Sequence, residues 1–246
     1  MKVALILTGH VRGWRPCYQG IKKHLLDNHD VDIYISTWTE NNQGRTSTNA
    51  NWYDTVPIDL QPVIDLYKPK IINALNPKEY YATRFPPVEV EESKSFWVER
   101  LRDQFYVKKL GYELIPNPEE YDIIVLQRLD LMLESINLKK VDNIVLPDDK
   151  SVARCFRSQP KIITRSDGSI YEDYTPSLPL WMTDHMAYGS PSKMKIYCDI
   201  FDYMPDYFKD NTNIFAIECC VGKYITQYKN ITPLRDIIDY YLIQVS

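Results

Sequence analysis

The sequence predicts an α/β fold built on a doubly wound, mostly parallel sheet. The first half of the chain alternates short apolar runs with helical spacing in the order β-α-β-α-β-α-β, which is typical of parallel sheets. Residues 122–126 form an apolar run dominated by β-branched residues, as in strands that are buried on both faces. The chain has 246 residues and neither an internal repeat nor a low-complexity linker, so we expect a single domain.

The first strand is predicted over residues 3–7, a continuous apolar run that stops at Thr8. A helix over 15–29 follows, because apolar residues recur there at helical spacing. The other elements of this half are strands over 32–38, 70–75 and 122–126, a helix over 58–67 with Pro62 weakening its middle, and a helix over 93–110 with Gly111 as its stop. Residues 41–51 are almost wholly polar, and we expect a mobile loop there.

The turn after the first strand carries two glycines, Gly9 and Gly13, which let the backbone bend sharply and approach a ligand closely. Such a turn before a helix favours anions, because free backbone N–H groups and the helix dipole point at the ligand. We therefore expect His10 and Arg12 to contact a diphosphate, with an exposed turn as the alternative. The spacing matches neither a dinucleotide-binding fingerprint nor a P-loop.

Polar residues also end two other predicted strands. Thr37 and Trp38 end the second strand, and Arg128 and Asp130 follow the fourth. Because open α/β sheets bind ligands at the carboxyl ends of their strands, we expect these side chains near the first turn. Two interpretations stay open. Either Asp130 holds a divalent cation or a sugar hydroxyl while Arg128 faces an anion, or the two residues form a structural ion pair.

The second half of the chain has shorter elements. They are strands over 131–133, 144–146 and 186–188, a hairpin with strands over 161–164 and 169–171, a helix from Pro191 to about Tyr203, a helix over 214–228, and a last helix or strand over 233–245. Ser190 and Pro191 are typical of a helix N-cap and first position. Asp184 lies just before the strand over 186–188, and Glu218 lies on the helix over 214–228.

Composition excludes several functional classes. Lysine and arginine total 29 against 33 aspartates and glutamates, and this formal charge of −4 argues against sequence-independent binding of nucleic acids. No apolar run of about 18 residues is present, so we expect no transmembrane helix. The apolar N-terminus is too short for a secretory signal. Five cysteines without metal-site spacing indicate buried thiols in a reducing compartment, and we expect a soluble, cytoplasmic protein.

Five segments of the chain share an order with a known family. They are Gly9 to Arg12, Thr37-Trp38, Gln104-Phe105-Tyr106, Tyr121 to Asp130, and Asp184 to Ser190. This order resembles the pattern of small glycosyltransferases from bacterial surface-polysaccharide clusters and large DNA viruses. The resemblance spans most of the chain. It implies a GT-A fold, in which a Rossmann-like nucleotide-sugar half, here residues 1–133, is joined in one continuous sheet to an acceptor half, here residues 134–246.

The resemblance also implies a reaction, the transfer of a sugar from a nucleoside-diphosphate sugar to a glycan hydroxyl with inversion. We expect UDP as the nucleotide and a hexose or pentose as the sugar. For a viral member, which would act in the host cytoplasm, xylose is a candidate. The donor contacts that we predict are Thr8, Gly9, His10, Arg12, Thr37, Trp38, Arg100, Gln104 and Arg128.

The metal-binding element of this family is often Asp-x-Asp, whereas this chain has Arg128-Leu129-Asp130. Only Asp130 therefore matches as a ligand for Mn²⁺ or Mg²⁺, hard cations that take oxygen ligands. The departing nucleoside diphosphate needs stabilisation by a metal or by cationic side chains. Arg12 and Arg128 are candidates for the second role.

Direct displacement at the anomeric carbon also needs a base for the acceptor hydroxyl, and a carboxylate within hydrogen-bond reach is sufficient. Asp184 is the first candidate, with a structural role bonded to backbone as the alternative, and Glu218 is the second. We expect His185 to be a satisfied polar residue, not a catalyst.

Two other functions are weighed against this one. A methyltransferase would bind S-adenosylmethionine at Gly9 to Gly13, but no acidic residue ends the second strand to hold a ribose. A non-catalytic carbohydrate-binding module would use the nineteen tyrosines and five tryptophans and would bind glycan without nucleotide.

Overall fold

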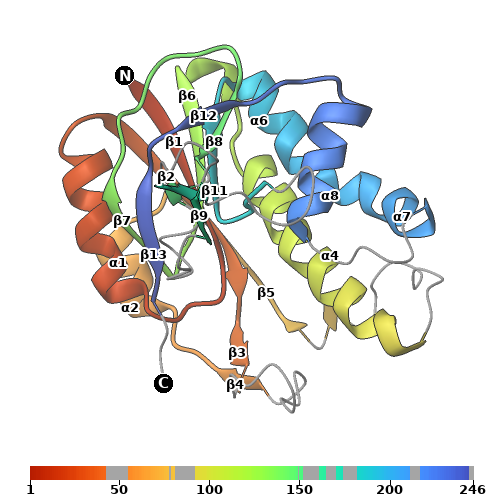
Figure 1. The fold of residues 1–246 in the computed structure, drawn as a ribbon. Helices are drawn as coiled ribbons and strands as arrows, with labels where there is room; N and C mark the ends of the chain where they lie inside the picture. Colours follow the sequence, from red (N-terminus) through yellow and green to blue (C-terminus); the bar gives the residue numbers. More distant parts are fainter. Residues whose placement is uncertain are drawn as a thin grey trace.

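The computed structural model describes residues 1–42, 55–77, 79–80, 92–148, 150–151, 161–164, 170–173, 182–210 and 217–243, with the backbone alone at 41–42, 55, 92–101, 161–164, 170–173, 209–210 and 217–218. These residues form an α/β protein with a seven-stranded, mostly parallel sheet between layers of helices (Figure 1). The predicted fold class is confirmed at this level.

The strands of the main sheet lie in the order β12-β8-β11-β6-β1-β2-β5. Their bounds are β1 Lys2–Gly9, β2 Asp30–Trp38, β5 Ile71–Leu75, β6 Ile123–Arg128, β8 Ile144–Pro147, β11 Met186–Gly189 and β12 Leu234–Asp236. Strands β5, β2, β1 and β6 run parallel to one another, β11 is antiparallel to both of its neighbours, and β12 is parallel to β8. A single sheet thus joins the two halves of the chain.

The centre of the sheet explains the apolar runs of the sequence. Residues 3–7 of β1 and 123–126 of β6 are fully buried. A strand that is covered on both faces needs apolar side chains in both directions, so its sequence is continuous and does not alternate.

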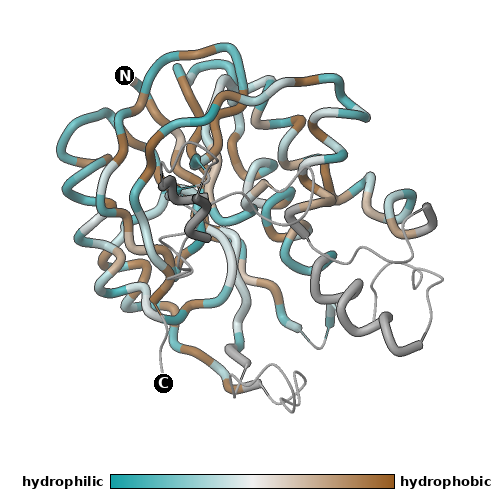
Figure 2. The backbone as a smooth tube through the Cα atoms, viewed as in Figure 1, coloured by the Kyte–Doolittle hydropathy of each residue, from teal (hydrophilic) through white to brown (hydrophobic). Residues whose placement is uncertain are grey.

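Helices cover both faces of the sheet (Figure 1). One face carries α1 (Trp14–Ile21), the π-helical turn η1 (Lys22–Leu26), α2 (Gln61–Tyr67) and a small antiparallel sheet of β7 (Leu131–Ser135) and β13 (Asp239–Leu242). The other face carries α4 (Glu92–Glu113), α6 (Pro191–Cys198), α7 (Ile200–Asp210) and α8 (Ile217–Lys223). Hydrophobic and hydrophilic stretches alternate along the flanking helices, as expected for elements with one buried side (Figure 2).

The remaining elements are short. They are the turns η2 (Pro118–Glu120) and η3 (Tyr224–Tyr228), the hairpin of β3 (Glu40–Asn42) with β4 (Thr55–Pro57), and the hairpin of β9 (Lys161–Thr164) with β10 (Ile170–Asp173). The second hairpin confirms the prediction for that part of the chain. The polar loop predicted over 41–51 begins in β3, and the rest of it lies outside the described residues.

Two predictions about single residues in helices were wrong. Gly111 does not stop α4, which continues to Glu113. Instead, a Cβ atom at Gly111 would lie 2.5 Å from the side chain of Ile6, so the glycine lets the helix approach β1 closely. Pro62 does not weaken the middle of α2, because the helix begins at Gln61 and the proline occupies its first turn, where proline is tolerated.

The second half departs from prediction at two places. The helix expected from Pro191 to about Tyr203 is two helices, α6 and α7, separated at Asp199. The last segment is neither one helix nor one strand but the two strands β12 and β13, which join different sheets. Periodicity over so few residues could not reveal the partners of these strands.

Candidate functional site

The order in which the chain adds strands to the main sheet reverses between β1 and β6. The chain builds β2 and β5 on one side of β1 and then returns through α4 to place β6 on the other side. Ligands of open α/β sheets bind at such a point, beyond the carboxyl ends of the strands. Thr8 pairs with Arg128 in the register of β1 and β6, and the N–H of Leu129 donates to the Thr8 carbonyl at 2.9 Å. The segments that follow these strands therefore lie side by side, as predicted.

The turn after β1 is supported from inside the protein. Gly9 and Gly13 have φ angles of +95° and +64°, in the left-handed region that favours glycine. The hydroxyl of Thr37, a fully buried residue of β2, donates to the carbonyl oxygen of Gly9 at 2.6 Å. Thr8 is also buried. Thr37 thus holds the turn in shape from beneath, and both of these predicted donor contacts are buried under the turn.

Two arginines converge on Asp130. Arg128 donates from Nε to Oδ1 and from Nη2 to Oδ2, both at 2.8 Å, and Arg12 donates from Nε to Oδ2 at 3.4 Å. The side chains of Arg12 and Arg128 are 26% and 20% exposed, whereas that of Asp130 is 7% exposed. Burial opposes ionisation of Asp130, but the charge of Arg128, followed by that of Arg12, outweighs it and lowers the pKa. An ionised carboxylate therefore lies beneath two guanidinium groups.

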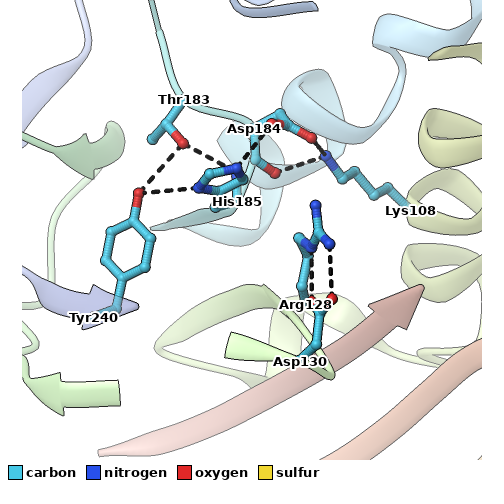
Figure 3. A network of polar contacts seen from close by, with 7 residues as sticks. All are labelled: Lys108, Arg128, Asp130, Thr183, Asp184, His185 and Tyr240. Carbon is cyan, nitrogen blue, oxygen red and sulfur yellow. Dashed lines mark hydrogen bonds and ion pairs between the residues drawn. The ribbon is translucent and has the colours of Figure 1, made fainter. Parts of the chain in front are cut away.

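A second, more deeply buried ion pair lies near Arg128 (Figure 3). Lys108 of α4 donates from Nζ to the carbonyl oxygen of Asp184 at 2.7 Å and to its Oδ2 at 3.0 Å. Burial opposes the charge on Asp184, but Lys108, His185 and Arg128 together hold its pKa well below the usual range. The carboxylate is thus ionised and already paired, so a base at this position would first have to lose its bond to Lys108.

A buried network of polar contacts extends from Asp184 to the C-terminal strand (Figure 3). His185 Nε2 lies 3.8 Å from Asp184 Oδ1, and its Nδ1 lies 3.3 Å from the hydroxyl of Tyr240 in β13. Thr183 accepts the backbone N–H of His185 at 3.2 Å. Burial lowers the pKa of His185 to about 4, although Asp184 opposes this shift, so the ring is neutral at neutral pH. This agrees with the prediction that His185 is a satisfied polar residue.

An aromatic row begins at the first turn. The ring of His10 stacks on Trp38 with centroids 6.3 Å apart, Trp38 meets the edge of Tyr80 at 5.2 Å, and Tyr80 stacks on Tyr106 of α4 at 5.1 Å. Trp38 is only 5% exposed, so it packs within the protein. Burial and the charge of Arg12 lower the pKa of His10 to about 4, which leaves a neutral ring beside the arginines.

No family model matches this chain. No curated protein matches it either. What the site does must therefore be inferred from the arrangement of its own residues.

The structure brings most of the predicted site residues to one edge of the sheet. Thr8, Gly9, His10, Arg12, Thr37, Trp38, Arg128 and Asp130 all lie at the carboxyl ends of β1, β2 and β6, with Asp184 at the start of β11 beside them. Gln104 is half-buried on α4 and makes no polar contact with the described residues of the site. Arg100 and Glu218 lie in α4 and α8, but their side chains fall outside the described residues.

Sequence reasoning missed Lys108 and Tyr240. A signal for Lys108 did exist, because it follows the buried Phe105 by three positions and therefore occupies the inward side of the helix. A lysine at such a position indicates a buried partner. Tyr240 gave no comparable signal, since its contact with His185 depends on β13 pairing with β7.

The residues around Asp130 are a poor set of metal ligands. Among the described residues there is no group of three or more histidine, cysteine, aspartate and glutamate side chains that could hold a metal ion. Both oxygens of Asp130 accept hydrogen bonds from guanidinium groups, so a cation at this carboxylate would lie beside two positive charges.

In the part of the chain that the structure describes, every helix is too short or too polar to span a bilayer.

Proposed function

We propose that this protein is a glycosyltransferase that takes its sugar from a nucleoside-diphosphate donor, with UDP as the expected nucleotide. The observation that carries this proposal is the position of Arg12 and Arg128 at the point where the order of strand addition reverses. Arg12 follows β1 and Arg128 ends β6. Both arginine side chains are partly exposed over the buried Asp130. Arginine in this setting suits the planar, multidentate recognition of phosphate oxygens.

The local charge supports an anionic ligand. Asp130 and Asp184 are ionised and the two histidines are neutral. The partly exposed charges of this cluster are the arginines Arg12 and Arg128, in a protein whose formal charge is −4. Such local fields draw anionic ligands into a site.

The fold also supports the proposed glycosyltransferase function. A parallel half, which contains the first turn, continues in one sheet into a mixed half. This is the arrangement that a GT-A fold implies, with the donor in the first half and the acceptor in the second.

In the proposed reaction, the acceptor hydroxyl oxygen forms a bond to the anomeric carbon of the donor. The bond from that carbon to the diphosphate oxygen breaks, and its electron pair stays with the nucleoside diphosphate. The hydroxyl proton passes to a carboxylate. Asp184 and Glu218 stay the predicted bases, and for Asp184 the pairing with Lys108 must loosen first.

The rival functions fit this site less well. A carbohydrate-binding module recognises neutral hydroxyls and has no need of two arginines at a strand end. A methyltransferase of this fold needs an acidic ribose contact at the end of the second strand, where this chain has Ser36, Thr37 and Trp38. Neither rival accounts for the two partly exposed arginines.

Titration calorimetry with UDP, GDP and CDP tests the proposal, followed by hydrolysis assays with the matching nucleotide sugars. Arg12→Ala is the informative variant, because Asp130 keeps its bidentate bond to Arg128 and the fold is preserved. We expect the dissociation constant to rise by at least about tenfold, the value of one charge-assisted contact. Lys22→Ala, which removes an exposed cation paired with Asp27, is the control and should bind as wild type. If no nucleoside diphosphate binds, the proposal fails.

A further inference from the structure

We propose that this site neutralises the diphosphate with fixed arginine side chains and without a divalent metal, and that Asp130 is a positioning residue for those arginines. This inference rests on the proposed function. It departs from the metal role that the family resemblance gives to Asp130.

The layering of charges is the first argument. The side chains of Arg12 and Arg128 are the more exposed part of the cluster, at 26% and 20%, whereas the side chain of Asp130 is 7% exposed. An anion that arrives from solvent meets the cations first. A metal ion would have to reach the carboxylate past two positive charges.

The occupancy of the carboxylate is the second argument. Oδ1 accepts from Arg128, and Oδ2 accepts from both Arg128 and Arg12. A bidentate arginine–carboxylate pair is strong because both hydrogen bonds are charge-assisted and geometrically matched. Magnesium keeps near-octahedral oxygen coordination, commonly with one or two carboxylates plus substrate phosphates. Among the residues that the structure describes, Asp130 belongs to no group of three or more histidine, cysteine, aspartate and glutamate side chains that could hold such an ion.

The third argument concerns what the pair does for the reaction. A long arginine side chain loses rotamer freedom when it is fixed, and Asp130 fixes both arginines before the donor arrives. As the bond from the anomeric carbon to the diphosphate breaks, the electron pair moves onto the departing oxygen. Guanidinium N–H groups that are already in place donate to that oxygen without reorganisation.

The two possible roles of Asp130 predict opposite results for Asp130→Asn. If the carboxylate is a metal ligand, the variant loses affinity for the nucleotide whenever binding requires metal. If it positions arginines, the variant removes a negative charge near the phosphates, so UDP measured in excess EDTA binds as well as in wild type, or up to about tenfold more tightly. Turnover then falls by at least about tenfold, because the guanidinium groups lose their fixed direction.

The experiment is calorimetry with UDP on the full chain in excess EDTA and, separately, in MnCl₂, followed by steady-state transfer or hydrolysis assays. Asp122→Asn is the matched control, because Asp122 lies just before the opposite end of β6 and pairs there with Lys140. We expect this control to behave as wild type. A fall in kcat with unchanged KM and an unchanged stoichiometry of UDP binding in Asp130→Asn separates positioning from a loss of fold, because unfolded protein would lower the stoichiometry together with kcat.

Wild-type dissociation constants that agree within about threefold in EDTA and MnCl₂ support the inference, and a larger preference for MnCl₂ overturns it. Loss of UDP binding in Asp130→Asn also overturns it, while leaving the proposed transferase intact. If UDP binds wild type under neither condition, and no other nucleoside diphosphate binds, the proposed function fails and this inference fails with it.

Discussion

At the scale of single residues, the pair of Lys108 and Asp184 decides how tightly α4 is held to the start of β11. Their side chains are only 2% and 4% exposed. A buried ion pair adds little net stability compared with an apolar pair, but removal of one partner strands an uncompensated charge. The pair therefore fixes the position of α4 relative to the start of β11, two elements that are far apart in the sequence.

We expect Lys108→Met to lower the free energy of unfolding by about 3–5 kcal/mol, because Asp184 would lose its cation while still buried. Urea denaturation measures the change. The double variant Lys108→Met with Asp184→Asn removes both charges and should recover part of this loss. Lys109→Met is the neighbouring control, since its partner Asp202 is 54% exposed, and it should cost less than about 1 kcal/mol. Equal losses of unfolding free energy in Lys108→Met and Lys109→Met would contradict this role of the buried pair.

At the scale of elements, close contact of helices with strands depends on glycine. Gly20 of α1 packs so tightly against β7 that a Cβ atom would overlap the carbonyl oxygen of Leu133. Gly111 of α4 faces a side chain instead, that of Ile6 in β1. Backbone cannot move aside as a side chain can. Position 20 should therefore tolerate a larger residue less well than position 111, although both lie within helices.

We predict that Gly20→Ala destabilises the protein by about 1–3 kcal/mol, the usual range for overpacking. Gly111→Ala should cost less, because the new Cβ atom meets the side chain of Ile6 and not a backbone atom. Thermal and urea unfolding of the two variants provide the comparison. The reverse order would show that β7 moves more easily than the centre of the main sheet.

At the scale of the whole molecule, the buried titratable groups set how stability depends on pH. The folded-state pKa of His185 is about 4, below its ordinary value of 6.5, so between these values the unfolded chain binds a proton that the folded chain does not. Stability is therefore complete above about pH 6.5 and falls as the pH drops toward 4. The lowered pKa values of Asp130 and Asp184 remove further stability at still lower pH.

His185→Gln tests this dependence, because glutamine is neutral in both states. Between about pH 7 and pH 4.5, the loss of unfolding free energy should be smaller in the variant by about 2 kcal/mol. His24→Gln is the control. That residue is only half-buried on η1, so its replacement should change the pH dependence far less. Parallel pH profiles for wild type and His185→Gln would show that the ring is not held neutral by the fold.

Much of the fold could be predicted from local sequence. The apolar runs at residues 3–7 and 123–126 indicated buried parallel strands, and the ends of these strands indicated that Arg128 and Asp130 lie near the first turn and Arg12. The same local view misjudged Gly111, because a glycine late in a helix looks like a stop whether or not a neighbouring strand packs closely against it. Lys108 was also missed, although its place three positions after the buried Phe105 puts it on the inward side of the helix.

The sequence by itself determined the layered α/β architecture and the edge at which the polar residues gather, because strand burial and strand ends are local properties of the chain. Only the tertiary structure decided which partner each charge has. Asp130 is held under Arg12, which precedes it by 118 positions, and Asp184 is held by Lys108 at a separation of 76. Such pairings depend on strand order and on helix placement, which no spacing along the chain encodes.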